Sequence, residues 1–310
     1  MATNVPYYTD KDPNSINLYA GLSGATLPVD EYELGHGVTL SKTYAHFMAP
    51  FLMAFSPAQQ GKPHPTPWKA ANGGFGFDIH CQLFVPKEFK QPYWFDHVNT
   101  IWWITALLRL KASTQIFVPV IANENFASIP LLSEEPYFWP VEVSPRTIIL
   151  DPEKAKEHIE LESLEWVRKY WLPGAMLLHN FDDFNIAMQA FDQCKWAYSP
   201  SLALVSLWGS LEKLFSSPNA ELRFRISATI ASFLEPPGEK RFSLYKNIRS
   251  LYDARSKAAH GARLGNSVPL IQTYALMRRI LIKIIQENSV PSGEQLEAAI
   301  FGNENLGSDL

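Results

Sequence analysis

The chain has little cysteine. Two residues among 310, Cys81 and Cys194, lie far apart and outside any CxxC pair, so a disulfide framework and a cysteine zinc site are excluded. The beginning, MATNVPYYTDKDPN, lacks the basic-then-apolar order of a secretory signal. The most apolar runs, FMAPFLMAF and IWWITALL, are far shorter than the roughly 18–20 residues that span a bilayer. We therefore expect a cytoplasmic protein that does not enter a membrane.

An excess of positive charge is also absent from the chain as a whole, whose formal net charge is −4. Residues 222–283, however, hold twelve Lys or Arg and three acidic residues, so this segment carries +9 and the rest of the chain −13. Such a segment can gather a phosphate backbone without making the whole protein bind nucleic acid. Equally, these cations can lie on solvated helix faces, paired with acids from other segments.

Residues 1–150 are rich in proline, glycine and aromatic residues, with short apolar runs between turn signals. The alternation in residues 77–86 predicts a half-buried strand, and residues 115–122 and 140–150 resemble further strands. One helix is predicted over residues 95–111, and residues 59–77 are predicted to form an exposed loop. We expect a β-rich N-terminal domain.

From Asp151 the pattern becomes helical. Asp151 followed by proline, and Ser199 followed by Pro200, are typical helix beginnings. Further helices are predicted over residues 181–198, from 219, over 242–260 and from 267 to 286. The helix after Ser199 has an apolar stripe at Leu204, Leu207, Trp208, Leu211, Leu214 and Phe215. The fold class is therefore α+β, with an all-α bundle over residues 151–290 and an acidic tail over 291–310.

The stretch LYDARSKAAHG, residues 251–261, ends one of these helices. Arg255 continues the apolar line of the helix, so it needs an anionic partner, and Glu212 is the best candidate. His260 lies five residues later, about 140° around an ideal helix, but Gly261 can end the helix in a left-handed conformation. A titratable imidazole near a permanent guanidinium charge suits phosphodiester chemistry. An ordinary capping histidine and a solubilising arginine would give the same pattern.

This stretch resembles the Arg-x4-His signature of the HEPN superfamily, the higher eukaryotes and prokaryotes nucleotide-binding domains. Upstream, LVSLWGSLEKLF and ELRFRISATIASFL resemble the Apea-like branch in particular. The resemblance covers roughly residues 155–290, and the helix with the glutamate, the helix with arginines and the Arg–His helix follow one another in the family's order. The first 150 residues resemble no family that we can name.

The resemblance implies a metal-independent endoribonuclease without a cofactor, a toxin or antiviral defence protein that acts in growth arrest and is completed by homodimerisation. His260 would then transfer protons, Arg255 would stabilise the phosphate charge and Glu212 would orient Arg255. Lys257, Ser256, Arg223 and Arg225 would hold the RNA, for which tRNA is a candidate. The N-terminal domain would bind a trigger or ligand, or select the substrate.

Other interpretations remain open at this level. The HEPN domain can be a non-catalytic module that binds RNA or nucleotides or mediates dimerisation, with Arg255 and Glu212 bracing the core. Tyr93, Trp94, Trp102 and Trp103 can line a ligand pocket or fill a core. Asp78 and His80 share one face of a predicted strand, which is weak evidence for a metal. Asp182 and Asp183 are expected to cap a helix, and Tyr274, Met277 and Leu281 can lie in a dimer interface or in the bundle core.

Overall fold

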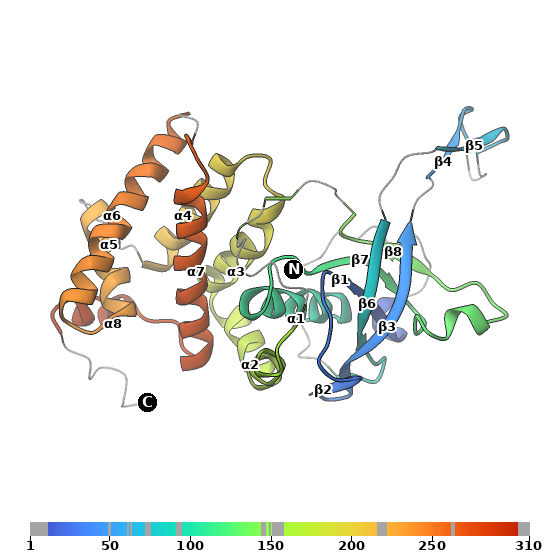
Figure 1. Ribbon diagram of the computed structural model, residues 1–310, viewed down its shortest axis with the longest axis horizontal. Helices are drawn as coiled ribbons and strands as arrows, with labels where there is room; N and C mark the ends of the chain where they lie inside the picture. Colours follow the sequence, from blue (N-terminus) through green and yellow to red (C-terminus); the bar gives the residue numbers. More distant parts are fainter. Residues whose placement is uncertain are drawn as a thin grey trace. The chain divides into compact units, whose positions relative to one another are not determined.

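The computed structural model of the chain describes residues 12–48, 51–60, 62, 64–71, 76–90, 95–143, 147–148, 150, 158–215, 222–261 and 264–302. It has two compact units, coloured along the chain in Figure 1. The sheet unit comprises residues 1–101, 115–145 and 156–160, and the helical unit comprises residues 102–114, 146–155 and 161–310. The predicted α+β class is confirmed. The predicted boundary at residue 150 differs from this division, because residues 102–114 group with the helices.

The sheet unit contains a six-stranded antiparallel sheet in the order β2-β3-β6-β1-β7-β8. The predicted alternation is present in β6, where Ile79, Cys81, Leu83 and Val85 are all fully buried. The strands are β1 (Leu18–Ser23), β2 (Glu31–Gly35), β3 (Val38–Met48), β6 (Gly76–Val85), β7 (Phe117–Ala122) and β8 (Phe138–Pro140), with short 3-10 helices η1 (Pro13–Ser15) and η2 (Ile129–Leu131).

Two expectations for this unit are corrected. The strand predicted over residues 140–150 is instead β8, which ends at Pro140, although Val141 and Glu142 still donate backbone hydrogen bonds to β7. The predicted loop over 59–77 contains a strand, β5 (Trp68–Ala71), because β4 (Phe51–Ala54) supplies an antiparallel backbone partner. The prolines and the glycine between β4 and β5 favoured the prediction of a loop, although these strands form a hairpin.

The helical unit contains most of α1 (His97–Lys111) and all the helices after residue 160. These are α2 (Leu161–Asn180), α3 (Asp182–Gln193), η4 (Cys194–Trp196), α4 (Pro200–Phe215), α5 (Leu222–Leu234), α6 (Glu239–Ala259), α7 (Val268–Glu287) and α8 (Gly293–Ile300). The predicted start of α4 is confirmed, since the Leu202 backbone N–H donates to the Ser199 hydroxyl, and all six residues of its predicted stripe are buried. No helix of the chain as described is both long and apolar enough to traverse a bilayer.

Helix α2 begins at Leu161, and residues 158–160 of the predicted helix are not helical. Residues 151–157 lie outside the described chain, and His158 and Ile159 pair with the backbone of Thr26 instead of joining the helix. The cap predicted at Asp182 and Asp183 is also corrected: both lie in the first turn of α3, and Phe181 occupies the capping position. Part of the predicted acidic tail is helical, because α8 packs against α5.

The interior of the helical unit answers two questions that the sequence left open. Tyr274, Met277 and Leu281 on α7 are buried within the single chain, so they belong to the bundle core. Trp103 is fully buried and donates to the Trp171 carbonyl at 2.6 Å. Gly174 is required there, because a Cβ at this position would lie 2.8 Å from the Trp103 ring. Trp103 therefore fills a core; Tyr93 and Trp94 lie outside the described residues.

Candidate functional site

The candidate site is built on the contact between α4 and α6. Trp208 of α4 and Tyr252 of α6 meet edge to face, with ring centroids 5.2 Å apart. The Trp208 indole also donates to the Thr273 hydroxyl of α7 at 3.3 Å, which ties the three neighbouring helices together (Figure 1). These aromatic contacts set the register of the next turn, where α4 presents Glu212 and α6 presents Arg255.

Arg255 is held by Glu212, the partner that its sequence position required. The Arg255 Nη2 atom lies 2.9 and 2.8 Å from the two carboxylate oxygens, and the guanidinium carbon lies 5.5 Å from the centre of the Tyr252 ring. The side chains of Arg255 and Glu212 are 23% and 19% exposed, so the pair is shielded but still accessible to water. Within the described chain, the Arg255 Nε atom is buried without a hydrogen-bond acceptor. The guanidinium is fixed in place, and its Nε–H donor is unused.

Tyr252 is the residue of this site that sequence reasoning missed. Burial raises the pKa of its hydroxyl, the Glu212 carboxylate raises it further, and the Arg255 charge opposes the effect. The phenol therefore stays protonated near neutrality and can serve as a ring support and a hydrogen-bond donor. The sequence contained a signal, since Tyr252 stands three residues before Arg255, a spacing that places two side chains next to each other on a helix.

His260 occupies the end of α6, as its glycine neighbour predicted. The last helical residue is Ala259, and His260 takes the capping position with its backbone N–H donating to the Ser256 carbonyl at 3.2 Å. Gly261 follows with a φ of +85°, a left-handed conformation in which glycine avoids the strain of a side chain. The imidazole is exposed, and none of the residues placed by the structure forms a side-chain hydrogen bond or ion pair with it.

The single chain does not bring Arg255 and His260 to one point. Arg255 lies on the line of α6 that faces α4, together with the buried residues Ile248, Leu251 and Ala258, whereas His260 faces solvent. The angle of about 140° between positions five apart on a helix explains this separation. A site that uses both groups on one phosphate needs a second set of side chains.

The four predicted RNA-binding residues have different surroundings. Arg223 forms an ion pair with Asp253, and Arg225 forms one with Glu297 at 2.9 Å, so both arginines are occupied within the chain. Lys257 is exposed, and Ser256 is half-buried with its carbonyl accepting from His260. Of the four, Lys257 alone remains as an open cationic side chain near the end of α6.

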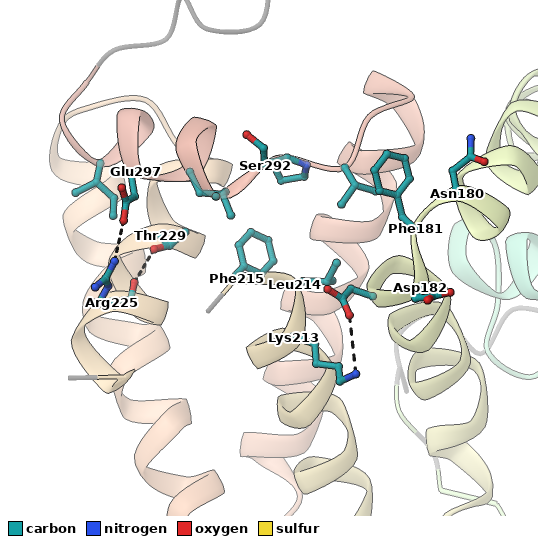
Figure 2. A pocket seen from close by; sticks show the side chains of 16 residues that line it. Asn180, Phe181, Asp182, Lys213, Leu214, Phe215, Arg225, Thr229, Ser292 and Glu297 are labelled. Carbon is teal, nitrogen blue, oxygen red and sulfur yellow. Dashed lines mark hydrogen bonds and ion pairs between the residues drawn. The ribbon is translucent and has the colours of Figure 1, made fainter. Parts of the chain in front are cut away.

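A cavity of about 630 Å³ lies elsewhere in the helical unit (Figure 2). Its walls come from the α2–α3 junction, the end of α4, α5, the segment before α8 and α8 itself. The ion pair of Arg225 with Glu297 lies on one side, and Lys213 approaches Asp183 at 3.9 Å on the other. Arg255, Glu212 and His260 do not line it. Cavity and Arg–His motif are therefore separate features.

The weak evidence for a metal at Asp78 and His80 gains no support from the structure. Asp78 on β6 accepts from His46 of β3, with 2.8 Å between the nitrogen and the carboxylate oxygen, and Tyr44 lies 3.3 Å from the same oxygen. The hydrogen bond from His46 lowers the pKa of Asp78. Across the described ranges, no three His, Cys, Asp or Glu side chains are arranged to hold a metal ion. Asp78 therefore has a local hydrogen-bonding role on an exposed face of the sheet.

Comparison with known proteins adds no constraint: no family model, no curated protein and no solved structure matches the chain. The functional argument therefore rests on the side chains themselves.

Proposed function

We propose that the chain is a metal-independent endoribonuclease of the HEPN type, active as a homodimer in which two α6 termini form one composite site. The observation that carries this proposal is that the two groups of one chain lie on different sides of α6. Arg255 is fixed by Glu212, while His260 is exposed at the helix end. A second copy of the chain would place its own Arg255 and His260 beside those of the first copy. Two-fold symmetry would place two imidazoles and two guanidinium groups around one phosphate.

The chemistry requires only proton transfer and charge stabilisation, since RNA contains its own nucleophile. One His260 takes the proton from the ribose 2′-hydroxyl, whose oxygen forms a bond to phosphorus. The bond from phosphorus to the 5′-oxygen breaks, and the second copy's His260 gives that oxygen a proton. Arg255 stabilises the charge that develops on the phosphoryl oxygens. The products are a 2′,3′-cyclic phosphate and a 5′-hydroxyl end.

We place this activity in the cytoplasm, in defence or growth arrest, with tRNA as the first substrate to examine. The sheet unit would bind the trigger or ligand, or select the RNA. The resemblance of residues 155–290 to Apea-like HEPN domains supports this assignment, as does the cationic segment around α6. No cofactor takes part in the proposed reaction.

The test is cleavage of total tRNA by the purified chain in EDTA. We expect cyclic phosphate ends, and we expect His260→Ala to reduce the rate about 10²- to 10⁴-fold, the usual contribution of a general acid or base. His179→Ala, which alters an exposed histidine of α2, is the matched control and should leave the rate unchanged. Cleavage that His260→Ala retains, or an inactive wild-type homodimer, would overturn the proposal.

A second candidate is a non-catalytic binding module, favoured by one observation. The Nη2 atom of Arg255 approaches both oxygens of Glu212, an arrangement that also braces two helices. In that case the wild-type chain cleaves no RNA, and Arg255→Ala lowers the melting temperature as its principal effect. Measuring cleavage and melting on the same variant separates the two candidates.

A further inference from the structure

A cluster of aromatic rings and cations covers the outer side of α5 and α6. It consists of Phe224, Phe242, Tyr245, Lys246 and Arg249, which we call the aromatic–cationic strip. Tyr245 contacts both phenylalanine rings, with centroids 5.9 Å from Phe224 and 6.3 Å from Phe242. The Lys246 amino group lies 4.6 Å from the Phe242 ring centre, and the Arg249 guanidinium 5.5 Å from that of Tyr245. Each of the two cations therefore lies over the ring four residues before it on α6.

The strip is open to solvent. Phe224 is 54% exposed and Phe242 is 60% exposed, which is unusual for two phenylalanines in contact with one neighbour. Among the residues that the structure describes, neither Lys246 nor Arg249 forms an ion pair with a carboxylate. Two acids stand on this side of α6: Asp253 already pairs with Arg223, and Glu239, in the first turn, forms no ion pair with Lys246 or Arg249 among the described residues. The strip therefore keeps its positive charge, and its rings keep exposed surface.

The geometry of α6 connects the strip to His260. Residues 242, 245, 246 and 249 share one side of the helix by the spacing of three and four, and the same spacing continues through 253, 256 and 257 to 260. Eighteen residues of helix cover roughly 27 Å. A ligand that lies along this side of α6 therefore meets the aromatic–cationic strip, then Lys257, and finally the exposed imidazole.

Single-stranded RNA matches these features better than other ligands. Exposed rings stack on bases of any sequence, and a neighbouring cation contacts the phosphate that follows each base. A duplex keeps its bases stacked inside, so it cannot use the rings. A second copy of the chain would bring the same cations against each other, a repulsion that a dimer interface avoids.

We propose that the aromatic–cationic strip binds single-stranded RNA and leads it along α6 to His260. Binding itself is inferred from the side chains of the strip; the statement that the bound strand is the substrate rests on the proposed function. The strip replaces Arg223 and Arg225, which are occupied by carboxylates, as the surface that holds the strand.

Binding is tested on the full chain with a fluorescent 2′-O-methyl RNA 12-mer, which cannot be cleaved because it has no free 2′-hydroxyl. We expect Phe242→Ala to weaken binding about 10-fold, the effect of losing one base-stacking ring. Lys246→Ala should weaken it and reduce the slope of log affinity against log salt by about 1. Fluorescence anisotropy measures both.

Matched controls come from the same unit. Phe301→Ala removes another exposed phenylalanine, and Lys169→Ala removes a cation that lies over the ring of Tyr170. Neither control should change RNA affinity. A 12-base-pair duplex with the same sequence should bind more weakly than the single strand.

The inference is overturned if Phe242→Ala and Lys246→Ala bind as the wild type does, or if the duplex binds as tightly as the single strand. It is also overturned if these variants change the dimerisation constant in sedimentation and leave RNA affinity unchanged, which would make the strip a protein interface. Failure of the proposed function is distinguishable: the 12-mer would still bind through the strip, although no RNA would be cleaved. His260→Ala should reduce cleavage about 10²- to 10⁴-fold with 12-mer binding retained.

Discussion

Two arginine–carboxylate pairs in the helical unit have similar geometry but different surroundings. Arg109 of α1 lies 2.9 Å from Asp192 of α3, and Arg255 of α6 lies 2.8 Å from Glu212 of α4. The side chains of the first pair are 2% and 0% exposed, and Asp192 also accepts from the Trp102 indole at 3.0 Å. Those of the second pair are 23% and 19% exposed.

This difference separates a structural pair from a candidate functional one. The fully enclosed pair of Arg109 and Asp192 cannot contact a ligand. Removing one of its two partners would leave the other charge unpaired in the interior, which destabilises the fold. A pair at the edge of the core keeps its arginine in a fixed position, within reach of an incoming phosphate. The sequence distinguishes the two only weakly, because both arginines interrupt apolar helix faces.

The largest expected effect comes from breaking the enclosed pair. Asp192→Ala leaves the Arg109 charge buried without its partner, so we expect the free energy of unfolding to fall by about 3–5 kcal/mol. Urea denaturation measures the loss. Asp183→Ala, at a half-exposed position in the first turn of α3, is the control and should cost less than about 1 kcal/mol. A loss below about 1 kcal/mol for Asp192→Ala would remove the distinction between the two pairs.

Breaking the edge pair should have a smaller effect. Arg255→Ala is expected to cost about 1–2 kcal/mol, because water can reach the Glu212 carboxylate that remains. Arg223→Ala breaks the more exposed ion pair with Asp253, whose side chains are 46% and 45% exposed, and should cost under about 1 kcal/mol of unfolding free energy. It extends the comparison to a third level of exposure. A destabilisation by Arg255→Ala as large as that by Asp192→Ala would identify Arg255 as an internal brace.

Of the two buried thiols, Cys194 lies near the enclosed pair and Cys81 lies in the sheet unit. Burial raises the pKa of Cys81 to about 12 and raises the pKa of Cys194 well above its usual range, the latter with a contribution from the Asp192 charge. In the unfolded chain both thiols ionise near pH 8.5, while in the fold they stay protonated. The free energy of unfolding should therefore fall as pH rises above about 8.5, by up to roughly 1.4 kcal/mol per pH unit for each thiol.

The same thiols give a local measurement at pH 8. Neither should react with a disulfide reagent in the native chain, and Asp192→Ala should increase the reaction rate of Cys194 as the helices around it open more often. Cys81, in the sheet unit, is the internal control and should stay protected. Equal acceleration at both thiols would show that the substitution unfolds the whole chain.

The smallest expected effect on stability belongs to His260. Its side chain is exposed and forms no hydrogen bond or ion pair with the described residues, so His260→Ala should change the free energy of unfolding by no more than about 0.5 kcal/mol. Gly261→Ala, one residue later, should cost about 1 kcal/mol, because its φ of +85° strains any side chain. Thermal melting of both variants checks this. A loss of several degrees for His260→Ala would assign the imidazole to the helix cap.

Local sequence patterns predicted the structure well where the residues that determine a feature all lie within one short segment. Ser199 and Pro200 began α4 as expected, and Gly261 ended α6. The alternation in β6 and the stripe of α4 also identified buried faces. The pairing of Glu212 with Arg255 followed from a similar argument, since a charge on an apolar line requires a partner and Glu212 stands at the edge of such a line.

Predictions failed where the cause lies in a distant segment. Residues 158 and 159 are not helical as predicted, because they pair with the backbone of Thr26, and β5 forms because β4 lies across a loop. Arg223 and Arg225 look free in the sequence, and their partners Asp253 and Glu297 stand 30 and 72 residues away. The aromatic–cationic strip was missed because its rings come from two helices.

The amino-acid sequence by itself determined the class of the fold, the helix that carries Arg255 and His260, and the sides of that helix on which they stand, because caps, periodicity and left-handed glycines act over a few residues. Tertiary structure alone decided which cations have partners and which remain open, since a charge is neutralised by whichever carboxylate the fold brings within about 4 Å.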